Sequence, residues 1–160
     1  MKYKRVFCYI MIALFSSVSC FHLFPDIRST VAVIVIENET NIDLYLDTNM
    51  QVQNTYERPH KGPVLSSSSF YLCTASRVDG YVSEMSMEDA CTNLDEAYFA
   101  IFSDAEKQQL LRKWLGSERD MPGKQFFNFG SYTSEDGGVS VAAVKQIRYI
   151  FHITQDDISQ

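Results

Sequence analysis

The chain has few residues of the kinds that most often carry chemistry. Only three histidines occur, His22, His60 and His152, and none has a histidine or cysteine neighbour at a metal-ligand spacing. The sequence also has no glycine-rich phosphate loop and no Gly-x-Ser-x-Gly elbow. These absences argue against a zinc centre, a nucleotide site and a serine hydrolase. We therefore expect no metal, no cofactor and no catalytic residue.

Basic residues are scarce as well. There are 14 lysines and arginines against 20 acids, and no basic cluster with interleaved aromatics, which argues against nucleic-acid binding. Between Arg77 and Lys107 the chain has no base and eight acids: Asp79, Glu84, Glu88, Asp89, Asp95, Glu96, Asp104 and Glu106. The favoured interpretation is a solvated face with acids at helix N-termini. The alternative is a cation site or a docking patch for a basic partner.

No hydrophobic run is long enough to span a membrane. The apolar run from Val6 to Phe15 has ten residues and follows three basic residues, whereas a spanning helix needs about 20 apolar residues. This pattern is typical of a secretory signal peptide. The small residues Ser17 and Ser19 then predict cleavage between Ser19 and Cys20, so we expect residues 1–19 to be removed.

The cysteine that follows the predicted cleavage site resembles the lipidated residue of a bacterial lipoprotein. Lipoprotein signals usually carry leucine three residues before this cysteine, and here Ser17 stands there, so an ordinary secretory signal is the alternative. Because Cys8 leaves with the signal, attaching palmitate-containing lipid to Cys20 leaves an even pair, Cys73 and Cys91. In an oxidising compartment this pair predicts a disulfide. The alternative is two buried, reduced thiols.

The mature chain is expected to form one domain behind a short tether. We assign residues 20–30 to the tether, 31–155 to a single globular domain and 156–160 to a polar tail. Roughly 140 residues are enough to bury one core. The tether has no acidic cluster behind Cys20, which favours a periplasm-facing anchor over a surface-exposed one.

Apolar and alternating runs predict a sheet. A β-branched run over 30–37 and an alternating run over 42–47 predict a hairpin, and further strands are expected over 70–73, 97–102 and 147–154. Residues 48–63 are expected to form a loop with a short edge strand near Val52. Residues 126–129 are expected to form a short strand or an aromatic plug, and 135–138 a turn.

Two capping patterns predict helices. Ser86 begins one helix, with Met87, Ala90, Cys91 and Leu94 on its apolar face. A capping box over 103–106 begins another that ends near Gly116 and places Trp114 in the core. The expected fold is therefore α+β, a mainly antiparallel sheet with two helices on one face. A β-sandwich with a helical insertion is the alternative.

Some segments resemble a known group of proteins. The chain is similar to short uncharacterised lipoproteins of Bacteroidales in the turn and strand over 37–45, in Ala97–Lys107 and in Tyr149–Ile158. These stretches are structural, and the group has no assigned activity. The resemblance implies localisation at the cell envelope and identifies no catalytic residue in this chain.

The functional expectation is a lipid-anchored, non-catalytic envelope protein that acts as an accessory or binding module. It would contact the membrane through its anchor and an envelope protein through its surface. One alternative is an exported hydrolase that uses acidic residues, or Cys73 or Cys91 with a histidine. Another is a surface binder of glycans or host proteins that uses exposed aromatics.

Overall fold

The structure is a computed structural model that describes residues 29–53, 59–77, 84–139 and 144–159. The predicted signal peptide, the cleavage site at Ser19 and Cys20, and His22 lie outside the described residues. No helix in the described part of the chain is long and apolar enough to cross a membrane.

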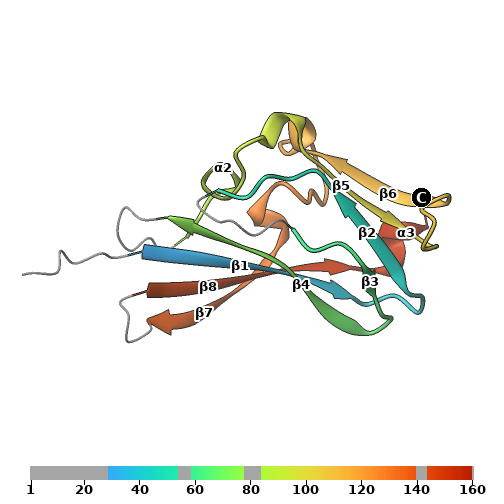
Figure 1. The fold of residues 1–160 in the computed structure, drawn as a ribbon, viewed down its shortest axis with the longest axis horizontal. Coiled ribbons are helices and arrows are strands. Elements are labelled where there is room, and N and C mark those ends of the chain that lie inside the picture. The colour runs from blue at the N-terminus through green and yellow to red at the C-terminus, as the bar shows by residue number, and fades with distance from the viewer. Residues whose placement is uncertain (1–28, 54–58, 78–83, 140–143, 160) are drawn as a thin grey trace, which may run out of the picture.

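Two four-stranded sheets form the body of the molecule (Figure 1). Sheet A has the order β4-β1-β8-β7 and sheet B the order β3-β2-β5-β6. All neighbouring strands are antiparallel except β1 and β8, which are parallel. The strands are β1 Ser29–Asn38, β2 Leu44–Thr48, β3 Pro63–Val64, β4 Ser68–Arg77, β5 Tyr98–Phe102, β6 Leu110–Leu115, β7 Thr133–Val139 and β8 Val144–Ile153.

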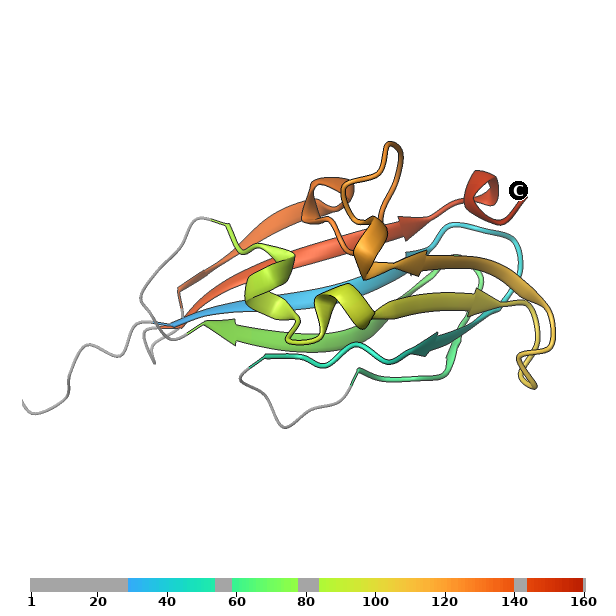
Figure 2. The same cartoon turned by 90° about the horizontal axis from the view of Figure 1, so that it is seen from above.

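Helices contribute little to the described residues. The two α-helices, α2 Met87–Ala90 and α3 Gln155–Ile158, have four residues each, and α2 lies over sheet A (Figures 1 and 2). Three short 3₁₀ turns complete the set: η1 Leu94–Glu96, η2 Gly116–Glu118 and η3 Phe129–Ser131. The architecture is mainly β with two largely antiparallel sheets, so the expected α+β fold holds only in part.

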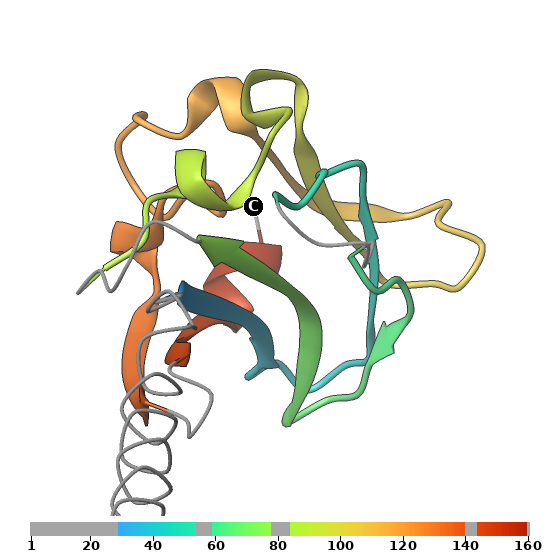
Figure 3. The same ribbon diagram turned by 60° about the vertical axis from the view of Figure 1, so that its left-hand side comes forward.

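One hydrophobic core joins the two sheets. Strand β1 lies at its centre because its β-branched residues alternate inward, with Ile34 and Ile36 fully buried. In Figure 3 the strands of sheet A lie on one side of the interior, and β2 and β5 lie on the other. Phe126 stacks on Phe99 of β5 with ring centroids 3.8 Å apart and meets Phe151 of β8 edge-on. The expected aromatic plug is therefore confirmed, and it fills the space between the sheets.

The hairpin predicted from 30–37 and 42–47 is wrong. Both strands exist, but β1 belongs to sheet A and β2 to sheet B. The connecting turn carries the chain from one sheet to the other, and Asn38 holds it. The Asn38 amide donates to the carbonyl of Ile42 and to those of Val64 and Leu65 near β3. A buried side chain therefore takes the place of hairpin pairing.

The helix predicted after the capping box over 103–106 is also wrong. Residues 110–115 form β6, which pairs antiparallel with β5. The Asp104 carboxylate accepts hydrogen bonds from the backbone N–H groups of Gln108 and Gln109, and Lys107 has a φ of 55°. The same acid that would cap a helix thus closes a hairpin loop. Trp114 is buried as expected, but it projects from a strand.

The first predicted helix is correct at its start and too long. Ser86 and Asp89 form the expected capping box, but α2 ends at Ala90. Cys91 is extended and forms an isolated bridge with Val52, which supplies the short extended pairing expected there. A backbone pairing with the loop therefore replaces the second half of the helix.

One smaller expectation near the C-terminus also fails. The predicted turn over 135–138 is part of β7, an exposed edge strand that pairs with β8. The predicted polar tail forms α3, and its buried Asp157 binds the Lys124 ammonium at 2.5 Å. The tail therefore docks on the domain.

Candidate functional site

The parallel pair β1 and β8 places three side chains that can bind a metal, two glutamates and one histidine, together at one end of sheet A. Glu37 and His152 are direct partners in the ladder, and the Glu39 N–H donates to the carbonyl of Ile153. The flanking residues Asn38 and Ile153 point into the core, so Glu37 and His152 project from the outer face of the sheet.

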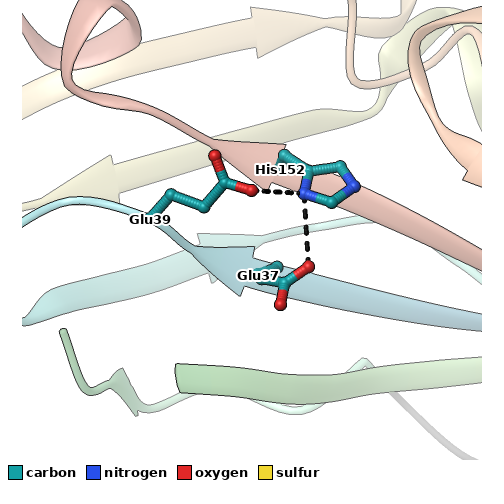
Figure 4. Close-up of side chains that lie close together, drawn as sticks. All are labelled: Glu37, Glu39 and His152. Carbon is teal, nitrogen blue, oxygen red and sulfur yellow. Dashed lines mark hydrogen bonds and ion pairs between the residues drawn. The ribbon is translucent and has the colours of Figure 1, made fainter. Parts of the chain in front are cut away.

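The carboxylates of Glu37 and Glu39 both point toward one nitrogen of the His152 imidazole (Figure 4). His152 Nδ1 lies 2.7 Å from Glu39 Oε1 and 3.2 Å from Glu37 Oε2. One ligand atom from each residue lies within 4.8 Å of the others. On the far side of the ring, Nε2 lies 2.7 Å from the hydroxyl of Thr133 on β7. We call Glu37, Glu39 and His152 the carboxylate–histidine cluster.

This cluster can hold either a proton or a cation between its groups. With Nδ1 protonated, the ring donates to the carboxylates; without that proton, Nδ1 and two carboxylate oxygens present three electron pairs to the same space. The imidazole is about a quarter exposed, at 28%, so the space is open to solvent. Glu37 and Glu39 were not predicted as site residues, because neither the parallel pairing of β1 and β8 nor the path of the turn can be predicted from local pattern.

A second site is a groove of about 400 Å³ beside α2. Acidic and aromatic side chains from several segments form it. We call it the acidic groove and define it by Glu84, Glu88, Arg119, Asp120, Phe129 and Tyr149. Three carboxylates face one guanidinium there, so the groove carries a net negative charge at neutral pH.

The floor of the groove is aromatic and fixed in place. The rings of Phe129 and Tyr149 stack in parallel, 4.1 Å apart. The Tyr149 hydroxyl accepts a hydrogen bond from the backbone N–H of Met85 at 2.8 Å. Burial raises the pKa of this phenol, and the nearby charge of Glu84 adds to the effect, so the hydroxyl stays neutral.

The one base of the groove is already engaged by acids. Arg119 binds Glu88 through Nε at 3.2 Å and Asp95 through a terminal nitrogen at 2.7 Å. Glu84 and Asp120, by contrast, are exposed on the rim. The groove therefore presents carboxylates above an aromatic floor, an arrangement that attracts ammonium and guanidinium groups.

Among the described acids between Arg77 and Lys107, two hold local structure and two line the groove, while Asp79 lies outside the described residues. Asp89 caps α2 and binds Arg77 at 3.1 Å, as expected of an acid at a helix N-terminus, whereas Asp104 closes a hairpin loop where a helix was expected. Hydrogen bonds from Ser86 lower the pKa of Asp89. Glu84 and Glu88 instead line the groove, which fits the docking alternative.

The predicted disulfide does not form in the structure. Cys73 and Cys91 are both buried, and neither is in a disulfide. The Cys91 thiol donates to the side chain oxygen of Asn93 at 3.2 Å, and burial raises its pKa. Because Cys91 lies in the extended bridge to Val52, it does not project from a helix toward β4 as expected. The alternative of two reduced, buried thiols describes the structure.

A thiol hydrolase finds no support in this arrangement. Burial favours the thiol over the thiolate, which is the nucleophile. His60 contacts the ring of Tyr71, with centroids 5.3 Å apart, and His152 contacts the two glutamates.

The pKa of Asp47 is strongly perturbed, but the bonds of its carboxylate are structural. Burial alone would raise its pKa, yet hydrogen bonds from Lys61, Tyr98 and Lys107 outweigh burial and lower the pKa to about 2. The carboxylate ties the loops beside β2 to β5. With its oxygens so engaged, Asp47 is unsuited to act as a general base at neutral pH.

Comparison with known proteins does not assign this chain to a family. No protein-family model matches the chain, and no curated protein matches it. The likeness to Bacteroidales lipoproteins therefore stays a prediction, and function is inferred from the two sites.

Proposed function

We propose that this protein is a lipid-anchored, non-catalytic binding module of the bacterial cell envelope. The proposed localisation is based on the sequence, which has a basic start, a ten-residue apolar run and Cys20 after Ser19. A periplasm-facing anchor is proposed because no acidic cluster follows Cys20. The binding role rests on the acidic groove, the feature of the fold best suited to hold a ligand.

Replacing Cys20 with alanine is expected to abolish lipidation. A bacterial strain that expresses the chain would be fed a palmitate analogue, and label on the purified protein would be measured. Cys8→Ala is the matched control, because Cys8 leaves with the signal peptide and its loss should not change the label. Equal labelling of wild type and Cys20→Ala would show that the anchor is misassigned.

The chemistry of the groove favours a basic ligand. A guanidinium or ammonium group over the partly exposed ring of Phe129, which stacks on the buried ring of Tyr149, would gain a cation–π contact. The same group would reach the carboxylates of Glu84 and Asp120 on the rim. We propose that the ligand is an arginine- or lysine-bearing segment of an envelope protein.

Removing the rim charges is expected to weaken binding of a basic peptide. The purified full chain in detergent would be titrated with a fluorescent tetra-arginine peptide and followed by anisotropy. Loss of two exposed ion pairs in the Glu84→Gln, Asp120→Asn variant should raise Kd about five- to tenfold.

A matched control separates the groove from net charge. Glu106→Gln with Asp156→Asn removes the same charge from exposed positions in the β5–β6 loop and in α3. This variant should change Kd by less than about twofold, because screening weakens distant charges. Equal losses in both variants, or no binding by wild type, would contradict the groove as the ligand site.

A further inference from the structure

We propose that the carboxylate–histidine cluster is a binding site for a divalent first-row transition metal such as Zn²⁺. Glu37, Glu39 and His152 would each give one ligand atom, from β1, from the residue just after it and from β8. The site lies on the outer face of sheet A, and the proposal is independent of the acidic groove and of the lipid anchor.

The distances from the histidine nitrogen to the two carboxylate oxygens suit such an ion. Around a tetrahedral ion with bonds of about 2.0–2.1 Å, ligand atoms lie roughly 3.3 Å apart. The Nδ1 atom of His152 is 3.2 Å from Glu37 Oε2 and 2.7 Å from Glu39 Oε1. An ion can therefore take the place of the Nδ1 proton after small side chain movements, with no rearrangement of the backbone.

The second nitrogen of the ring is held as a metal ligand requires. His152 Nε2 lies 2.7 Å from the Thr133 hydroxyl on β7. When Nε2 carries the proton and donates it to this oxygen, the lone pair of Nδ1 faces the two carboxylates. Metal-binding histidines commonly have such an outer partner, which fixes the tautomer and the ring orientation.

The ligand set selects the class of metal. An imidazole nitrogen favours zinc and its neighbours over calcium and magnesium, which prefer six or more oxygen ligands. Two carboxylates balance the charge of a divalent ion. Three protein ligands leave one tetrahedral position for water, so an exposed, exchangeable ion is expected.

Zinc binding would be measured by calorimetry on the purified full chain in detergent after treatment with a chelator. Wild type should bind one Zn²⁺. His152→Gln and Glu39→Gln should each raise Kd at least tenfold, and Thr133→Val by about tenfold because it removes the outer partner. His22→Gln with His60→Gln removes the other two histidines and should bind as wild type does.

Thermal melting separates metal binding from folding. Without metal, all variants should melt within a few degrees of wild type; with saturating Zn²⁺, the melting temperature of wild type should rise and that of His152→Gln should not. If His152→Gln fails to fold, the zinc affinities of Glu39→Gln and Thr133→Val test the proposal instead. Unchanged binding in these variants, loss of binding in the control, or equal affinity for Ca²⁺ would overturn the proposal.

Discussion

Replacing Asn38 with leucine is expected to lower the free energy of unfolding by about 3–5 kcal/mol. The Asn38 side chain is fully buried, and its amide donates to three backbone carbonyls at 2.8–3.1 Å. Its oxygen accepts from the N–H and the hydroxyl of Thr40 at 3.0 and 2.7 Å. Leucine has a similar size but leaves these groups without partners, at about 1–3 kcal/mol for each that water cannot reach.

The effect should be large because the contacts of Asn38 join the two sheets. The side chain lies at the end of β1 in sheet A, and it holds the segment around Val64 in β3 of sheet B. Thermal unfolding of the full chain, followed by circular dichroism, should show a melting temperature lower by on the order of 10–20 °C. Asn41→Leu makes the same change at an exposed position of the same turn and should lower the melting temperature by a few degrees at most. Similar shifts in both variants would show that the hydrogen bonds contribute little.

The individual strands could be predicted because the residue types within each run are enough to favour a strand over a helix. β-branched and aromatic runs over 30–37, 97–102 and 147–154 have no helical alternative once their length and period are considered. They correspond to β1, β5 and β8. Pairing was not predictable, because hydrophobic alternation reports which face is buried and not which strand lies alongside. The chain crosses between sheets after β1 for a reason that local pattern does not contain, the long-range bonds of Asn38.

The region after Ser103 shows how one local signal supports two structures. An acid one residue after serine, followed by leucines and Trp114 at helical spacing, fits an amphipathic helix. The same Asp104 carboxylate also satisfies the backbone N–H groups of a hairpin loop, at 2.7 and 3.0 Å. Pairing of β6 with β5 and burial of Trp114 against Phe99 then favour the strand, because tertiary contacts outweigh weak helix propensity.

The two sites differ in what the sequence could reveal. Glu84 and Glu88 belong to the acidic stretch that the sequence marked as a possible docking patch. Phe129 and Tyr149 lie far from this stretch in sequence, and only the fold brings them beside the two glutamates. In the carboxylate–histidine cluster, Glu37 and His152 are 115 positions apart and become neighbours because β1 and β8 pair in parallel. Searching for closely spaced ligands could not detect such a site. A polar side chain at the outward position of each of two apolar strands was the local sign of this site.

Replacing Gly116 with alanine is expected to cost about 2–4 kcal/mol. A Cβ atom at this position would lie 1.7 Å from the carbonyl oxygen of Leu94 and 2.8 Å from its carbon. Both atoms belong to the backbone, so no side chain rotation can relieve the overlap. The Gly116 N–H also donates to the Ala97 carbonyl at 2.8 Å, so a shift that makes room for the methyl group weakens this bond.

Gly123→Ala is the control for the Gly116 substitution. Gly123 has a φ of 97°, but an added Cβ would meet no atom within 4 Å, so alanine there adds only backbone strain, about 1–2 kcal/mol. Thermal melting of both variants should therefore give the larger shift for Gly116→Ala. The Gly116 carbonyl accepts from Arg119, so the same variant should also weaken peptide binding at the acidic groove. A melting temperature for Gly116→Ala equal to or above that of Gly123→Ala would mean that η1 and η2 separate at little cost. Gly116 would then serve only to end β6, much as the sequence suggested that it would end a helix.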